Sequence, residues 1–262
     1  MDLQLAGKKV LVTGSTAGIG FATAFEFAAE GAAVVINGRG QERVDRAIAE
    51  IRKRHFRAQV TGAAADVSNA AGCAKLVQTV AQADVLVNNM GIFEPKPFEQ
   101  IPDADWLRLF EANVMSGVRL SRHYLSGMRE KNWGRIIFVS SESAVQIPAE
   151  MIHYGMTKTA QVAVARGIAE TVAGTGITVN SVLAGPTRSE GVETFIAKMG
   201  AGGDSAAFEA EFFKNIRPTS LLKRFETTEE VAHMIVYLCS PLASATNGAA
   251  VRVDGGVVRA IL

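Results

Sequence analysis

Cysteine, histidine and long apolar runs are scarce in this chain of 262 residues. Its two cysteines, Cys73 and Cys239, and its four histidines show none of the spacings that bind zinc, so no metal site is predicted. No apolar run reaches the roughly 18 residues of a membrane-spanning helix. The first residues, MDLQLAGKKVLVTG, lack the basic region and apolar stretch of a secretory signal. We therefore expect a cytoplasmic protein with no membrane partner.

An excess of charge of either sign is missing too. The chain has 27 basic and 26 acidic residues, so it carries no electrostatic footprint for a nucleic-acid partner. With 48% hydrophobic and 20% charged residues it has the composition of a globular protein, which excludes the disordered class. Its length suffices for one large α/β domain or two small ones.

Short apolar runs alternate along the chain with alanine-rich segments of helical length. The helical segments include Gly20 to Glu30 and Gln41 to Arg54. This alternation predicts parallel strands buried on both faces, hence a doubly wound α/β sheet of the three-layer αβα type. No linker divides the chain, so we expect one domain over residues 1–262. The strand-like runs are Val10 to Val12, Val34 to Ile36, Gln59 to Ala63, Val85 to Val87, Ile136 to Val139, Ile177 to Val182 and Val251 to Val253.

The segment from Thr187 to Phe225 breaks this rhythm, because it has no strand signal. We expect it to cover the substrate as a lid, with a surface helical hairpin as the alternative. Two interpretations of its side chains stay open: they form an apolar substrate site with a cation for an acidic group, or the phenylalanines only anchor the segment. The residues concerned are Phe208, Phe212, Phe213, Lys214, Arg217 and Arg224.

The first strand-like run leads directly into TGSTAGIG, Thr13 to Gly20, and then into a helix. Glycines let the backbone approach a phosphate, and the N–H groups and dipole of the helix attract the anion. The spacing of Gly14, Gly18 and Gly20 differs from the usual G-x-G-x-x-G, and no Lys-Ser or Lys-Thr of a triphosphatase loop follows. A dinucleotide site is predicted, and a tight loop without a ligand is the alternative.

HYGMTK, residues 153–158, places Tyr154 and Lys158 four positions apart, on one face of a helix. In a dry cleft a fixed ammonium beside a phenol favours the phenolate and lowers the pKa of the tyrosine from about 10. Such a pair predicts an acid that works near neutral pH.

Taken together, these motifs, NNMG at 88–91, Ser141 and VNSVLAG at 179–185 resemble the short-chain dehydrogenase/reductase family over nearly the whole chain. The resemblance implies a Rossmann-type sheet of about seven strands that holds a nicotinamide dinucleotide at the carboxyl ends of the strands. The chain departs from the family pattern at Met90, where the family has alanine. Ala184-Gly185 replaces Pro-Gly, with Pro186 one step later. Both departures put the substrate geometry in doubt.

The resemblance also implies the catalytic set. Tyr154 is the acid/base, and Lys158 lowers its pKa and holds the cofactor ribose. Ser141, thirteen residues before the tyrosine, polarises the carbonyl, with Ser140 as a one-residue alternative. Asn113, in FEANVMSG, supports a water that leads protons to the lysine.

The same resemblance implies the cofactor positions. After the second strand, Gly38 stands where members that prefer NAD carry aspartate, and Arg39 follows, so NADP(H) is favoured over NAD(H). The second basic residue often found in the glycine loop of NADP users is missing, and Arg39 as a solvated turn residue is the alternative. The implied contacts are Gly14, Ser15, Thr16, Gly18, Ile19, Gly20, Arg39, Asp66, Val67, Asn89, Tyr154, Lys158 and Thr187.

These expectations describe an NADP(H)-dependent oxidoreductase that interconverts a ketone and a secondary alcohol. A 3-oxoacyl thioester reductase is a variant, and an idle dinucleotide-binding sensor or scaffold is the alternative of another class. Among the polar residues near the site, Glu142, Gln146 and Glu150 are candidate substrate contacts, whereas His153 is expected to pack or lie at the surface. The apolar C-terminal end and the resemblance indicate a homodimer or homotetramer, and we predict the tetramer.

Overall fold

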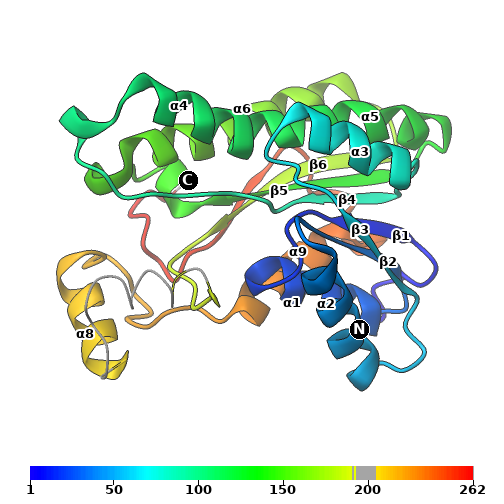
Figure 1. The fold of residues 1–262 in the computed structure, drawn as a ribbon, viewed down its shortest axis with the longest axis horizontal. Helices are drawn as coiled ribbons and strands as arrows, with labels where there is room; N and C mark the ends of the chain where they lie inside the picture. The colour runs from blue at the N-terminus through cyan, green and yellow to red at the C-terminus, as the bar shows by residue number, and fades with distance from the viewer. Residues whose placement is uncertain (191, 193–204, 262) are drawn as a thin grey trace.

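A parallel sheet forms the centre of the molecule (Figure 1) in the computed structural model, which describes residues 1–190, 192 and 205–261. Its order is β3-β2-β1-β4-β5-β6-β7, and every neighbouring pair is parallel. The doubly wound α/β prediction is therefore confirmed. The strands are β1 (Lys9–Val12), β2 (Ala33–Gly38), β3 (Val60–Ala64), β4 (Val85–Asn88), β5 (Gly134–Ser141), β6 (Ile177–Ala184) and β7 (Ala250–Val253).

Helices cover both faces of the sheet (Figure 1). One face carries α1 (Gly18–Ala29), α2 (Gln41–Arg54) and α9 (Thr228–Cys239). The other carries α3 (Ala70–Thr79), α4 (Asp103–Phe110), α5 (Ser116–Glu130) and α6 (Ile152–Thr171), with a π-helical turn, η2 (Glu111–Met115), between α4 and α5. Short 3₁₀ turns complete the connections: η1 (Phe98–Gln100), η3 (Glu142–Ala144), η4 (Ala149–Met151) and η5 (Pro241–Ala243).

A hydrophobic core lies on each face of the sheet, which explains why the strands are unbroken apolar runs in the sequence. Val10 and Val12 pack in the core under α1, α2 and α9, whereas Leu11 between them packs under α3 and α5. Successive side chains of a strand point to opposite faces, so a strand covered on both sides needs an apolar residue at every position. Burying one large apolar side chain stabilises the fold by about 1.5–3 kcal/mol.

The order of the strands creates a crevice at one edge of the sheet. From β1 the chain winds outward through β2 and β3 and then returns to β4 on the other side of β1. The loops after β1 and β4 therefore leave in opposite directions, which is where open α/β sheets bind ligands. The connections after β5 and β6 reach the same edge.

The predicted lid is described only in part, since residues 191 and 193–204 of its 187–225 range lie outside the described residues. The described part contains α8 (Ser205–Asn215), which lies at one end of the molecule (Figure 1). In the part of the chain that the structure describes, no helix combines the length and apolarity needed to cross a membrane.

Gly20 is the position where the first turn of α1 tolerates no side chain. A Cβ atom there would lie 2.4 Å from Asn89 Nδ2 and 2.5 Å from the Gly14 carbonyl oxygen. We expect Gly20→Ala to lower the free energy of unfolding by about 1–3 kcal/mol, because backbone atoms cannot yield to the methyl group. Urea unfolding followed by circular dichroism measures the change.

Gly167→Ala is the matched control, because Gly167 lies in α6 with nothing within 4 Å of the added Cβ. It should raise the free energy of unfolding by about 0.4–1 kcal/mol. Equal effects of the two substitutions would contradict the close approach at Gly20.

Candidate active site

A cavity of about 600 Å³ lies at the carboxyl ends of the central strands. Its walls come from the loops after β1, β4, β5 and β6, from the first turns of α6 and from the segment around the end of α8. The structure thus brings together positions that are up to 206 residues apart in the sequence, from Ile19 to Phe225. The predicted site residues that line it are Ile19, Asn89, Ser141, Tyr154, Lys158 and Thr187.

The glycine turn after β1 fits a pyrophosphate. Gly14 and Gly18 have φ of +61° and +58°, a conformation that favours glycine. Asn89 Nδ2 donates to the carbonyl oxygens of Thr13 and Gly14 at 2.9 and 3.1 Å, which fixes the turn from the end of β4. α1 begins after Ala17 with no side-chain cap, so the N–H groups of its first turn can receive an anion.

Ser15 has a scaffold role in this turn. Its buried hydroxyl donates to the Val12 carbonyl oxygen at 2.7 Å and accepts from the Asn37 amide at 2.9 Å. The hydroxyl therefore joins β1 to β2, and the Ser15 amide adds to this link by donating to the Asn37 carbonyl oxygen at 2.8 Å.

The end of β2 has no room for an acidic side chain. A Cβ atom on Gly38 would lie 2.5 Å from Thr16 Cγ2, so the threonine fills the space that an aspartate would need. Arg39 follows in the turn and is exposed. Arg43, one helical turn later in α2, lines a second cavity beside Thr16 and forms an ion pair of 2.7 Å with Glu190. Arg43 could have been found in the sequence, because it follows Arg39 by four positions at the start of a predicted helix.

Asp66 and Val67 lie beyond the end of β3 and do not line the 600 Å³ cavity. The Val67 side chain is buried in the core, and Asp66 Oδ1 accepts from the Ser68 amide at 3.1 Å. The Ala65 amide donates to the Gly38 carbonyl oxygen at 2.9 Å. The two residues therefore share the edge of the sheet with the end of β2, which is compatible with their predicted place at an adenine ring.

Tyr154 and Lys158 lie on one face of α6, as their spacing predicts, with Lys158 Nζ 5.5 Å from the centre of the tyrosine ring. The ammonium donates to the Val139 carbonyl oxygen at 2.9 Å and to Gln161 Oε1 at 3.2 Å. Burial lowers the pKa of Lys158 to about 8, because the charged form is desolvated.

The predicted lowering of the tyrosine pKa is wrong for the structure as described. Burial raises the pKa of Tyr154, and the charge of Glu142 raises it further. The Ser141 hydroxyl nearby and the charge of Arg217 act in the opposite direction. Burial is the main reason, and the ammonium of Lys158 is held by the Val139 carbonyl oxygen and Gln161 Oε1.

The two serines at the end of β5 have different partners. Ser140 donates its hydroxyl to the Lys158 carbonyl oxygen at 2.9 Å, which ties the strand to α6. The Ser141 hydroxyl donates to Glu142 Oε2 and accepts from the Ser143 amide at 3.1 Å. Of the two serines, only Ser140 bonds its hydroxyl to the backbone of α6.

Asn113 lies in the π-helical turn η2 and is fully buried. Its side chain bonds to both backbone groups of Ile92 and donates to Thr157 Oγ1 at 3.0 Å. Gln161 Nε2 donates to the Asn113 carbonyl oxygen at 2.6 Å, so Gln161 links the asparagine to Lys158. Gln161 was missed in the sequence, although it follows Lys158 by three residues on the same helical face.

Both departures from the family pattern are accommodated without displacing these groups. Met90 packs against the core under α3 and α5, away from the cavity lining. After Ala184 the chain turns at Pro186, whose carbonyl oxygen accepts from the Glu226 amide at 2.9 Å. Thr187 is buried, forms an isolated bridge with Glu226 and donates its hydroxyl to the Gly185 carbonyl oxygen at 2.9 Å.

The phenylalanines of the predicted lid pack with one another, and two of them also line the cavity, so both interpretations of their role stay open. Phe213 and Phe225 are buried and pack with Phe208 and Phe212. Phe212 and Phe225 also line the cavity.

Two of the three basic residues named in this segment form ion pairs within the protein. Arg217 binds Glu142 and Glu150, and Arg224 binds Glu230. His153 is fully buried and its ring packs on Trp106 with centres 5.8 Å apart, in line with the packing role expected of it. Among the described residues no group of three or more histidines, cysteines or acidic residues could hold a metal, and both cysteines are buried and free.

Comparisons with known proteins agree with this geometry. A family model described as enoyl-(acyl carrier protein) reductase matches residues 14–258. The chain is 50% identical to a Bacillus subtilis protein named uncharacterized oxidoreductase YvaG, with all of both chains covered. It is 30% identical to 3-oxoacyl-[acyl-carrier-protein] reductase FabG of Aquifex aeolicus over 98% of this chain and 100% of that one. L-Sorbose reductase from Gluconobacter frateurii, complexed with NADPH and L-sorbose, superposes with a TM-score of 0.94 at 31% identity over all of both chains.

Proposed function

The chain belongs to the short-chain dehydrogenase/reductase family and is an NAD(P)-dependent oxidoreductase, and from this we propose that it uses NADP(H) to interconvert a ketone and a secondary alcohol. One observation carries the proposal. The hydroxyl of Ser141, the phenol of Tyr154 and the ammonium of Lys158 line the same cavity that the glycine turn borders through Ile19. A proton donor and a hydrogen-bond donor therefore meet where a nicotinamide dinucleotide would lie.

The nicotinamide ring, when bound, supplies or accepts the hydride. Tyr154 gives its proton to the substrate oxygen in reduction and takes it back in oxidation. Ser141 stabilises the charge that develops on that oxygen. Lys158 would hold the ribose hydroxyls, and Gln161 and Asn113 keep the lysine in place from behind.

NADP(H) is our proposed cofactor because the end of β2 rejects an acidic residue and offers arginine. Thr16 occupies the space beside Gly38. Arg39 is exposed in the following turn, and Arg43 lies beside Thr16. Two guanidinium groups suit a ribose 2′-phosphate, for which arginine provides charge and fixed donors. The NADPH bound by the L-sorbose reductase, which has the same fold, supports this assignment.

The substrate side of the cavity is largely apolar, with Phe93, Met151, Phe212, Ile216 and Phe225 in its walls. A small ketone, open or cyclic, fits such walls, and we propose that the 187–225 segment covers it. A 3-oxoacyl thioester reductase is the second candidate, favoured by the similarity to FabG. Turnover of L-sorbose, cyclohexanone and an acetoacetyl thioester with NADPH separates these substrates.

We further propose a homotetramer, and the exposed apolar end of the chain supports it, since Ile261 has 95% of its surface accessible. Static light scattering at micromolar concentration should give four times the mass of the 27.8 kDa chain. The mass of a single chain would refute the proposal.

Tyr154→Phe tests the proposed proton donor. It should lower kcat for ketone reduction by about 10²- to 10⁴-fold, the range that general acid catalysis contributes. NADPH affinity, measured by fluorescence titration, should remain close to that of the wild type. Unchanged turnover would assign the proton transfer to another group. Biological activity that survives in this variant without turnover would favour the sensor.

Arg39→Ala tests the proposed cofactor preference. The substitution removes a hydrogen bond between charged groups, which contributes about 1.5–3 kcal/mol. NADPH should therefore bind roughly 10- to 100-fold more weakly. NADH carries no 2′-phosphate, so its affinity should not change, and it serves as the internal control. Wild-type protein that binds NADH more tightly than NADPH would contradict the assignment.

A further inference from the structure

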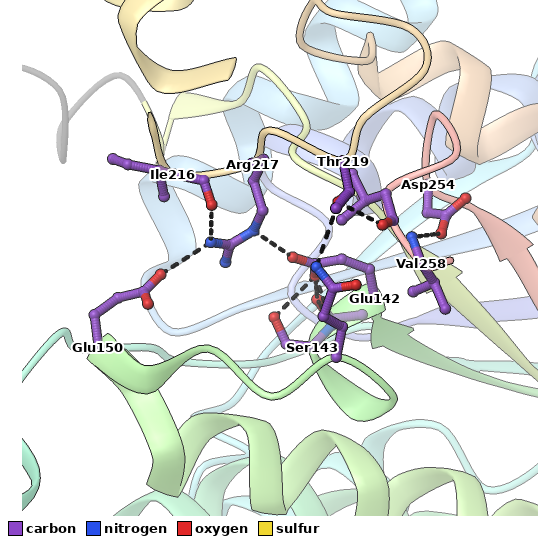
Figure 2. Close-up of polar contacts among 12 residues, drawn as sticks. Glu142, Ser143, Glu150, Ile216, Arg217, Thr219, Asp254 and Val258 are labelled. Carbon is purple, nitrogen blue, oxygen red and sulfur yellow. Dashed lines mark hydrogen bonds and ion pairs between the residues drawn. The ribbon is translucent and has the colours of Figure 1, made fainter. Parts of the chain in front are cut away.

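Arg217 lies between two carboxylates that come from different parts of the chain (Figure 2). Its Nε donates to Glu142 Oε1 at 2.9 Å, and its Nη1 donates to Glu150 Oε1 at 3.0 Å. Glu142 belongs to η3 after β5, Glu150 to η4 before α6, and Arg217 to the segment that follows α8. Glu142 and Arg217 are buried, whereas Glu150 is exposed, so the contact with Glu142 is the one that water screens least.

Hydrogen bonds of Arg217 and of its neighbour Thr219 hold this part of the chain in place. Its amide donates to the Phe212 carbonyl oxygen at 3.0 Å, at the end of α8. Thr219 donates to the Val257 carbonyl oxygen at 2.6 Å, which ties the segment to the chain beyond β7 (Figure 2). The guanidinium therefore reaches Glu142 from a wall of the cavity whose position the fold determines.

The Glu142 carboxylate is directly connected to the proposed catalytic hydroxyls. Its Oε2 accepts from the Ser141 hydroxyl, from the Ser143 amide at 2.6 Å and from the Ser143 hydroxyl at 2.8 Å. Four donors, with Arg217 as the fourth, suit a carboxylate, which only accepts hydrogen bonds. A negative charge thus lies one residue from Ser141 and beside Tyr154.

An uncompensated carboxylate at this place would oppose the proposed reaction. It disfavours the phenolate that Tyr154 becomes after giving up its proton and the charge that develops on the substrate oxygen. It also holds the Ser141 hydrogen away from the substrate. The charge of Glu142 raises the pKa of Tyr154 and the charge of Arg217 lowers it, as their positions require.

We propose that Arg217 is a positioning residue that compensates the Glu142 carboxylate, and that this ion pair determines how readily Tyr154 gives up its proton and whether Ser141 can turn to the substrate. The inference rests on the proposed function, because it assigns roles around Tyr154. In this proposal the segment after α8 lines the cavity and also supplies the positive charge that compensates Glu142.

Three further charged or titratable groups lie around the pair. Lys158 lies on the same helix as Tyr154 and donates to Val139 and Gln161. Glu226 and Asp254 lie behind the pair near Gly185, and burial raises the pKa of Glu226 to about 8. In the described residues Arg217 is the cation that bonds to Glu142.

The kinetic test compares Arg217→Met with the double variant Glu142→Gln/Arg217→Met. The single variant leaves the carboxylate uncompensated, so kcat for the fastest ketone of the panel should fall by roughly 10- to 100-fold, because Tyr154 becomes a weaker general acid. The double variant removes both charges and should recover most of that loss. If Arg217 only anchored the segment, the double variant would be no better than the single one, and that result would overturn the proposal.

Arg224→Met is the matched control, since Arg224 belongs to the same segment but pairs with Glu230 away from the cavity. It should leave kcat within about twofold, as expected for an exposed ion pair. A loss equal to that of Arg217→Met would assign the effect to the segment as a whole and overturn the proposal.

A second measurement needs no substrate. The chain has three tyrosines, so ¹³Cζ-tyrosine NMR resolves the Tyr154 signal, which Tyr154→Phe identifies. Glu142→Gln should convert Tyr154 to phenolate at a lower pH than in the wild type, because burial acts in both proteins and only the variant lacks the charge of Glu142. The same protonation state in both proteins would overturn the proposal. If no ketone is reduced by the wild type, the proposed function fails, and this titration still decides the role of the ion pair.

Discussion

The pairing of β1 with β2 on one side and β4 on the other is the constraint on which the site depends. It sends the loops after β1 and β4 apart and leaves a crevice at the carboxyl edge of the sheet. The glycine turn after β1 then lies against Asn89 at the end of β4. The side-chain amide of Asn89 donates two hydrogen bonds that fix the turn in place. Ser141 and Thr187 reach the same crevice because β5 and β6 continue the sheet in parallel.

Burying charged groups in this crevice costs desolvation free energy, and each group has hydrogen-bond partners that offset the cost. Lys158 is 4% exposed, and its ammonium is held by one carbonyl oxygen and one amide oxygen. Glu142 is equally buried and is held by hydroxyl, amide and guanidinium donors. Buried charges are tolerated where such partners are complete. The protonation of Tyr154 therefore depends first on its burial and then on the opposing charges of Glu142 in η3 and Arg217 in the segment after α8.

Much of the fold and part of the site could be predicted from sequence, because they follow from local spacing. Alternating apolar runs predicted the doubly wound sheet, and the i, i+4 spacing predicted that Tyr154 and Lys158 share a face. The direction of the tyrosine pKa could not be predicted, since it depends on how deeply the fold buries Tyr154 and on the charge of Glu142 beside it. Arg217 was considered only as a cation for a substrate, because nothing in its neighbourhood in the sequence indicates a carboxylate 75 residues earlier.

The sequence by itself determined the order of the elements, the phosphate-sized glycine turn and the residue types for proton transfer. Each of these depends on contacts within one turn or one strand, where chain geometry is nearly invariant. Only the tertiary structure decided which groups neutralise one another. The ion pair between Glu142 and Arg217 and the link from Lys158 through Gln161 to Asn113 join elements whose separation in space no local pattern encodes. Electrostatic interactions in a buried site depend on distances of a few ångströms, and these exist only once the sheet has folded.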